Sequence, residues 1–442
     1  MVELRFAYFT YALNLQEIRM RTSQFTNEEI SKAMLHICHS DTPMEAWLRY
    51  EQAGEVLHHC KFVFASDDER APAPGRAIRR DFSATGAVRT LFSSRNIIVI
   101  DRETSSEMRR GGSTFVIDYS ISLDTNALSY LLPFIDSKTT RLPADFSEVF
   151  TFIADPCTNV DAIPYRMENL QNLTGCPKDD KLIYLRLRAY EILRTLDPAT
   201  VADGKPRSYL TDAELEKCAQ EQMASFYESK NDAQLMENIR LNHEAMYCLL
   251  LKMCLIQLKR PSMSTKNKIL QFLEFCDTDL ATIFSREILL ARHYFVRGQD
   301  MNFFKKIMVG GHAPLKNLRN MAWDLWHVRQ LEISTTLRPI AGARYFFPAL
   351  LTFDKGLIEI IDLFPFRAIA YDEHVREPCI VYRCEWLSDI AGGDEKTCAA
   401  LEERFFSDKA RALRESNRPS RQSCLPKLID SLERELTMIV NL

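Results

Sequence analysis

Three short segments of this 442-residue chain each carry one aspartate among apolar and polar neighbours. Carboxylates that lie close together repel one another, so such a group either takes up protons or binds a hard divalent cation. Mg²⁺ and Mn²⁺ suit oxygen ligands, and either ion lowers the pKa of a bound water that can attack a phosphate. The sequence therefore predicts an acidic metal site that could activate a water beside a phosphate. The three aspartates are Asp124 in SLDTNAL, Asp324 in NMAWDLWH and Asp354 in LTFDKG.

Two of these aspartates follow predicted strands. Residues 115–123 alternate between apolar and polar side chains, which indicates a half-buried strand that ends just before Asp124. Asn126 is a candidate cap for the helix that follows. Residues 349–353 form an apolar run, which indicates a buried strand ending at Asp354. Because sites in open α/β sheets lie at the carboxyl ends of parallel strands, we expect both aspartates in one crevice.

The third aspartate lies on a predicted amphipathic helix over residues 315–332. Polar residues form one narrow stripe along this helix, and apolar residues line a different face. We expect the stripe to bring its carboxylate to the two strand ends. Its members are Asn317, Asn320, Asp324 and His327.

The ordered segments resemble those of the PIN-domain ribonucleases, a family with a small parallel-sheet α/β fold and an acidic metal site that cleaves RNA. The resemblance covers residues 115–173 and 315–364, about a quarter of the chain. It implies that Asp124 is the first-strand aspartate, Asp324 the late-helix aspartate and Asp354 the aspartate after the next strand. It also implies that these residues hold one or two Mg²⁺ or Mn²⁺ ions.

The family's second acid is usually a glutamate on an early helix. We assign Glu168 in IPYRMENL to this role, with Glu191 as the main rival and Glu148 as a weaker one. The long stretch between Glu168 and Asp324 then requires a large helical insertion. The supporting polar residues beside the acids are Thr125, Asn126, Asn320, His327 and Lys355.

Basic residues in the predicted insertion are candidates for contact with a phosphate backbone. Aromatic residues lie among them and could stack on unpaired bases. Solvation of the surface is the plainer explanation of the same charges. The basic candidates are Arg292, Arg297, Lys305 and Lys306, and the aromatic ones are Tyr294, Phe295, Phe303 and Phe304.

The predicted fold class is α/β: a PIN-like parallel sheet flanked by helices, with a long, mostly α-helical insertion and a mixed N-terminal region. Residues 407–426, polar and with two prolines, are expected to connect the body to a last helix over residues 427–440. The predicted parts are a mixed α/β N-terminal region (1–112), the first part of the PIN-like core (113–175), the helical insertion (176–313), the second part of the core (314–400), and the polar connection with the C-terminal helix (401–442).

Composition excludes several classes of protein. The chain has 56 Lys and Arg against 60 Asp and Glu, a net charge of −4, which excludes a strongly basic nucleic-acid coat. Its longest apolar run, residues 246–258, is too short to span a bilayer and contains Lys252. We read no signal peptide, and the twelve cysteines form no CxxC pair, so reduced thiols and a cytoplasmic location are expected.

The function that the resemblance implies is metal-dependent endonucleolytic cleavage of RNA. The resemblance adds a toxin or phage-defence role as an expectation. Two alternatives stay open: a catalytically inactive PIN-like scaffold that binds RNA or a protein, and a nuclease of related fold that cuts DNA. We expect an RNA substrate and no membrane, and the sequence leaves room for an inhibitory or activating protein partner and for an oligomer.

Overall fold

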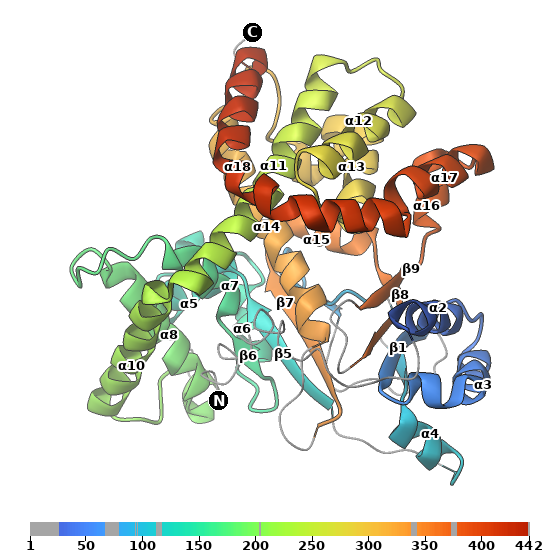
Figure 1. Cartoon of the computed structure of the whole chain (residues 1–442). Coiled ribbons are helices and arrows are strands. Elements are labelled where there is room, and N and C mark those ends of the chain that lie inside the picture. Colours follow the sequence, from blue (N-terminus) through green and yellow to red (C-terminus); the bar gives the residue numbers. More distant parts are fainter. Residues whose placement is uncertain are drawn as a thin grey trace. The chain divides into compact units, whose positions relative to one another are not determined.

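The computed structural model describes residues 26–66, 79–92, 94, 96–111, 117–202, 205–336, 343–372 and 378–440. The chain forms two compact units, each assembled from separate stretches. The first unit contains residues 1–237, 330–354 and 365–381, and the second contains residues 238–329, 355–364 and 382–442. The described part is mixed α/β and mostly helical, with two sheets (Figure 1).

The larger sheet belongs to the first unit and has five strands in the order β2-β3-β7-β5-β6. β5 runs parallel to both neighbours, with Leu123 opposite Leu351 of β7 and Ser122 opposite Asp161 of β6. β3 runs antiparallel to both β2 and β7, so the sheet is mixed, and parallel pairing joins β5, β6 and β7. The carboxyl ends of these three strands reach the same edge. The strands are β2 (Arg80–Asp81), β3 (Ala87–Arg89), β5 (Ile117–Leu123), β6 (Val160–Asp161) and β7 (Tyr345–Thr352).

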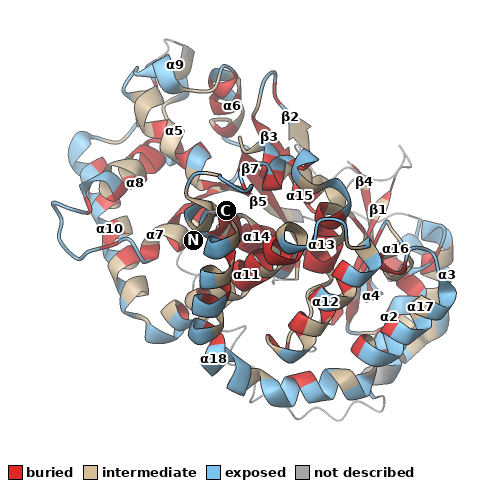
Figure 2. Ribbon diagram, turned by 90° about the horizontal axis from the view of Figure 1, so that it is seen from above, coloured by how far each residue is buried: buried red, intermediate tan, exposed pale blue. Residues whose placement is uncertain are grey.

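Helices connect the parallel strands, because a parallel pair needs a crossover connection. α5 and α6 lie between β5 and β6 in the chain, and α7 follows β6. The rings of Tyr130, Phe146 and Phe353 contact one another pairwise, with centroids 5.3–5.8 Å apart. β7 is buried along its whole length (Figure 2). The helices are α5 (Thr125–Ile135), α6 (Phe146–Ile153), α7 (Ile163–Leu170), α8 (Lys181–Arg194), α9 (Pro198–Ala202) and α10 (Asp212–Asn231).

The smaller sheet has the order β4-β1-β8-β9. β1 is antiparallel to β4 and to β8, with Val63 opposite both Val99 and Ile369. β8 follows the LTFDKG segment in the chain, yet it joins this sheet and not the one that contains β7. The elements are α2 (Asn27–Cys38), α3 (Pro43–Ala53), β1 (Cys60–Ser66), β4 (Asn96–Ile100), α4 (Arg102–Met108), β8 (Phe366–Asp372) and β9 (Cys379–Tyr382).

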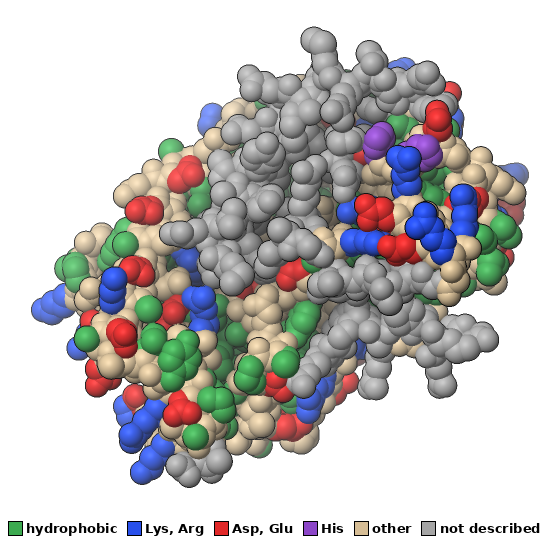
Figure 3. Space-filling model, turned by 90° about the horizontal axis from the view of Figure 1, so that it is seen from below, with side chains coloured by type: hydrophobic (Ala, Val, Ile, Leu, Met, Phe, Trp, Pro, Cys, Tyr) green, Lys and Arg blue, Asp and Glu red, His purple; other side chains and the backbone are tan. Residues whose placement is uncertain are grey.

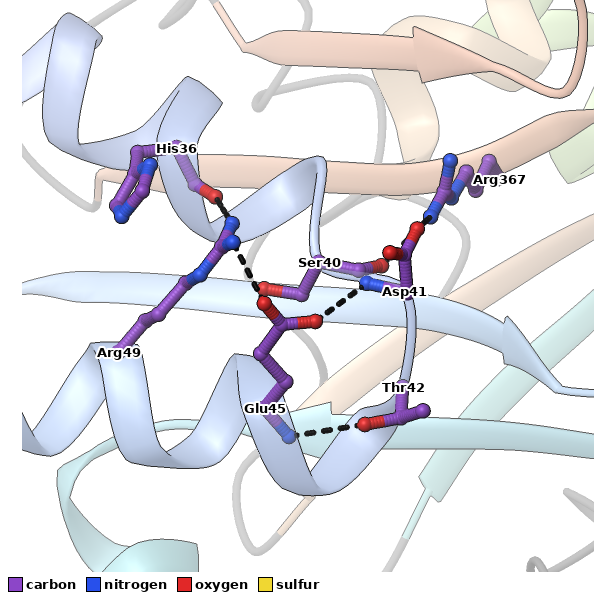
Figure 4. Close-up of polar contacts among 7 residues, drawn as sticks. All are labelled: His36, Ser40, Asp41, Thr42, Glu45, Arg49 and Arg367. Atoms are coloured by element: carbon purple, nitrogen blue, oxygen red, sulfur yellow. Dashed lines mark hydrogen bonds and ion pairs between the residues drawn. The ribbon is translucent and has the colours of Figure 1, made fainter.

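Hydrogen bonds from two arginines stabilise the turn between α2 and α3 (Figure 4). Arg49 of α3 donates to the carbonyl of His36 at 2.5 Å and to the carboxylate of Glu45 at 2.6 Å. Arg367 of β8 donates to the carbonyl of Ser40 at 2.6 Å. Carbonyl groups at a helix end lack partners within the helix, so these side chains satisfy backbone groups that the turn would leave open.

The second unit is helical in its described part. Its longest buried segment is the C-terminal half of α11, where ten of the eleven residues from 246 to 256 are buried. No helix in the described ranges is long and apolar enough to cross a membrane. The helices are α11 (Ala233–Lys259), α12 (Thr265–Thr278), α13 (Ser285–Arg297), α14 (Pro314–Thr335), α15 (Lys355–Leu363), α16 (Trp386–Ala391), α17 (Glu395–Leu401) and α18 (Asp408–Val440).

The predicted polar connection over residues 407–426 is wrong. These residues form the first part of α18, a single helix that contains Pro419 and Pro426. Proline removes one backbone hydrogen bond and bends a helix, and α18 turns sharply along its course (Figure 1). Its second half packs through apolar residues at helical spacing: Leu425, Ile429, Leu432, Leu436 and Val440.

Candidate active site

Asp124 is held at the carboxyl end of β5 by its backbone and by its side chain. Its N–H donates to the Leu351 carbonyl of β7 at 3.1 Å, which continues the parallel pairing past the last residue of β5. Its Oδ1 accepts the N–H of Ala127 at 2.6 Å, so Asp124 is the N-cap of α5. Asn126, the cap predicted from the sequence, is instead an exposed residue in the first turn of that helix.

The end of β7 brings a second carboxylate to this edge. Asp354 is half-buried, and its N–H donates to the hydroxyl of the fully buried Thr352 at 3.0 Å. Asp124 is level with Thr352 in the register, since the residues before them are opposite each other. Neighbouring strands lie about 4.8 Å apart, so Asp124 and Asp354 follow adjacent strand ends. The predicted strands before both aspartates are confirmed.

Thr125 adds a buried hydroxyl next to Asp124. Its Oγ1 has no hydrogen-bond partner among the described residues. A buried hydroxyl without a partner costs free energy, so this atom marks a position where a water or a ligand oxygen would be stabilised. Tyr130 lies further along α5, and burial together with the charge of Asp124 raises the pKa of its phenol.

Asp161 is a third aspartate at this edge, and the sequence analysis missed it. It ends β6, is 5% exposed, and accepts hydrogen bonds from the hydroxyls of Ser120 and Ser122, the second at 3.1 Å. It also accepts the N–H of Ile163 at 3.1 Å. β6 has only two residues, too few for an alternating pattern. The available signal was an aspartate three residues before Pro164, a residue typical of a helix start.

The three candidates for the second acid have different surroundings. Glu168 is half-buried on α7. Glu191 on α8 is buried and pairs with Arg194 at 3.0 Å; burial raises the pKa of its carboxyl, although Arg194 opposes this. Glu148 on α6 accepts the N–H of Ser83 at 3.0 Å, which lowers the pKa of Glu148. Glu168 is the predicted second acid, and its role stays a prediction.

Asp324 lies on α14, in the part that belongs to the second unit. The predicted helix is confirmed, but the residues of the polar stripe differ in exposure. Asn320 is exposed, Asp324 is half-buried, and His327 is 1% exposed with its ring 6.2 Å from the ring of Trp323. The first unit therefore contains three of the four predicted acids, and the second unit contains the fourth.

The predicted nucleic-acid contacts are only partly available on the surface. Arg292 donates to the carbonyl of Asp389 at 2.6 Å, and Arg297 pairs with Glu359 at 2.7 Å. Lys305 and Lys306 are exposed, as is Lys355 at the start of α15. The aromatic residues predicted to stack on bases are buried in the core, so that prediction is wrong. They are Tyr294, Phe295, Phe303 and Phe304.

No three His, Cys, Asp or Glu side chains in the described ranges lie close enough to form a metal cage. Mg²⁺ does not require one, because it keeps several waters and is usually bound through one or two carboxylates. Asp124 and Asp354, with the unsatisfied hydroxyl of Thr125 beside Asp124, are all oxygen donors and fit a hydrated ion of this kind.

No family model matches this chain, and no curated protein or solved structure matches it either. The resemblance to PIN-domain ribonucleases therefore depends on the sequence segments alone. The position of Asp124 and Asp354 after two adjacent parallel strands is an independent observation.

Proposed function

We propose that this protein is a metal-dependent nuclease of PIN-like type that hydrolyses phosphodiester bonds in RNA. The observation that carries the proposal is the parallel pairing of β5 and β7, because Asp124 directly follows β5 and Asp354 lies two residues past the end of β7. Ligands in open α/β sheets bind in the crevice outside the carboxyl ends of such strands. A toxin or defence role remains part of the proposal.

Asp124 and Asp354 would hold the metal ion in this proposal. A bound Mg²⁺ or Mn²⁺ would supply a water of lowered pKa and a positive charge beside the scissile phosphate. Glu168 is the further acid proposed for the first unit, and the contribution of Asp324, which belongs to the second unit, is tested separately.

The residues of the chain would fix the geometry of the reaction. The hydrogen bond from Ala127 holds the Asp124 carboxylate in one orientation, which limits its motion during the reaction. The Thr125 hydroxyl would donate to a water or a phosphate oxygen. Asn126 and Lys355, both exposed and each next to a candidate acid in the chain, would contact the substrate backbone.

The test is cleavage of a mixed pool of structured and single-stranded RNA in the presence of Mn²⁺, Mg²⁺ or EDTA. We expect cleavage that needs the metal ion and falls by orders of magnitude in Asp124→Asn and in Asp354→Asn. Asparagine keeps an oxygen that can cap α5, so the loss would reflect the missing charge. Asp136→Asn is the matched control, because Asp136 is exposed at the other end of α5.

Cleavage that survives both substitutions would contradict the site. No cleavage, together with no Mn²⁺ binding by calorimetry, would favour the inactive scaffold. Equal cleavage of a 2′-deoxy substrate would move the proposal to a DNA-cutting nuclease. Glu168→Gln and Asp324→Asn, run in the same assay, would show which of the two further acids contributes.

A further inference from the structure

A small polar cavity in the second unit is lined by positive side chains from the C-terminal part of α11 and from the residue that follows this helix. The cavity has a volume of about 220 Å³. Its charged lining residues are Lys252, Lys259, Arg260 and Glu435, which sum to a formal charge of 3 − 1 = +2. Leu255, Ile256 and Met263 form apolar walls, which strengthen any charge interaction inside by lowering the local dielectric constant.

Lys252 is a half-buried lysine of this cavity whose charge no hydrogen bond or ion pair of the described residues balances. Its ammonium lies 5.0 Å from the centre of the Phe275 ring. Burial lowers the pKa of this ammonium, Asp279 raises it, and the neighbouring charge of Lys259 lowers it again. Even a half-buried cation loses part of its hydration, and Lys252 has no hydrogen-bonded partner in the described ranges to replace it, so an anion in the cavity would stabilise this ammonium.

The helix dipole accounts for only part of this cluster. Lys259 ends α11 and Arg260 follows it, and positive charges are favourable at the carboxyl end of a helix. Lys252 lies about two turns before that end, where the dipole effect has faded. Lys259 also pairs with Glu435 of α18, whereas the exposed guanidinium of Arg260 has no side-chain partner among the described residues.

We propose that this cavity is a binding site for a dianionic phosphate group. Its net charge of +2 matches a dianion, and its volume suits a phosphate or diphosphate group better than a drug-sized ligand, which needs roughly 300 Å³ or more. The planar guanidinium of Arg260 can bind two phosphate oxygens, and the lysines act as point charges. The site lies outside the proposed catalytic edge and does not depend on the nuclease proposal.

The test is calorimetric titration of the full chain with inorganic phosphate in its dianionic form, in EDTA so that no metal ion contributes. We expect saturable binding that weakens at least about tenfold, or about 1.4 kcal/mol, in Lys252→Met and in Arg260→Gln. Lys266→Met is the matched control, because Lys266 is exposed on α12, pairs with Asp394 and does not line the cavity. Its affinity should stay within about twofold of wild type.

Two variants separate a loss of binding from a loss of folding, and two RNA probes identify the source of the phosphate. Lys252→Arg retains the charge and should restore most of the affinity, and Arg260→Gln changes an exposed residue whose loss leaves the core intact. RNA oligonucleotides with a 5′-phosphate or a 5′-hydroxyl distinguish a nucleic-acid end from a free phosphate compound as the source of the group. Absence of saturable binding by any phosphate probe, or equal affinity in all variants, would overturn the proposal.

Discussion

Asp124 has a structural role as well as the proposed catalytic one, and two substitutions separate them. Asp124→Ala removes the oxygen that accepts the Ala127 N–H and should lower the free energy of unfolding by about 1 kcal/mol. Asp124→Asn retains a capping oxygen and should lower it by much less. Urea unfolding monitored by circular dichroism measures both values. Equal stability of wild type and Asp124→Ala would mean that the cap contributes nothing.

Asp161 should matter for stability whatever its role in catalysis. Asp161→Ala would leave the buried Ser120 hydroxyl without its acceptor, and we expect a loss of about 1–3 kcal/mol in the free energy of unfolding. The exposed Asp136→Ala serves as the reference and should change stability by less than about 1 kcal/mol. A loss at Asp161 no larger than at Asp136 would contradict this account of the hydrogen bonds.

Single residues differed in how far the sequence could predict them. Asp124 and Asp354 follow long patterned strands, so their positions were predictable. Asp161 follows a two-residue strand that is defined only by pairing with β5, a contact that local periodicity does not encode. The sequence makes Tyr294 and Phe304 candidates for stacking on bases, but in the structure their rings stack on each other in the core, with centroids 3.8 Å apart. Residue type alone did not distinguish a core ring from a surface ring.

The turn between β2 and β3 is held by the carboxylate of Asp145, the residue just before α6. Asp145 accepts the N–H groups of Ala84, Thr85 and Gly86 at 3.0, 2.6 and 2.7 Å. Burial alone would raise the pKa of Asp145, but these three N–H groups together outweigh burial, so its pKa lies below the ordinary value. A Cβ at Gly86 would lie 2.8 Å from a methyl group of the buried Val149, so a larger residue there would force this side chain to shift.

Because of Asp145, the free energy of unfolding of the first unit should fall at acidic pH. Because the pKa of Asp145 is lower in the folded state, its stabilisation is fully present above the unfolded pKa of about 4 and is lost as the pH falls through the folded pKa. Asp145→Asn should lower the free energy of unfolding at neutral pH by about 1–3 kcal/mol. It should also flatten the decline below about pH 4, as urea unfolding at a series of pH values would measure. If Asp145→Asn lost stability at low pH as steeply as wild type, this role of Asp145 would be contradicted.

Elements with strong periodicity were predictable, and elements defined by distant partners were not. β5, β7 and α14 follow the patterns on which they were predicted. The polar half of α18 contains serines, arginines and two prolines, which favour a loop locally. The helix nevertheless continues through this half into a second half whose apolar side chains are buried. β8 pairs with β1, about three hundred residues earlier in the chain, and no local pattern specifies that partner.

The whole chain carries little net charge, with 56 Lys and Arg against 60 Asp and Glu. Figure 3 shows Lys and Arg side chains interspersed with Asp and Glu over the described part of one face. RNA binding would then depend on a few local contacts, because a protein without a broad basic surface releases few counterions from RNA. Of the four predicted contacts, Arg292 and Arg297 already have protein partners.

We therefore expect a shallow salt dependence of RNA binding. With Lys305 and Lys306 alone in contact, the slope of log K against log salt for single-stranded RNA should be about −0.7 × 2 = −1.4, whereas all four contacts would give about −2.8. Fluorescence anisotropy with Asp124→Asn in EDTA and a 5′-hydroxyl RNA measures this slope without cleavage and without a terminal phosphate. Replacing both lysines by glutamine should bring the slope close to zero, and Lys316→Gln on the exposed start of α14 should leave it unchanged. A slope steeper than about −3 in the parent protein would mean that RNA binds a larger basic surface than the predicted residues provide.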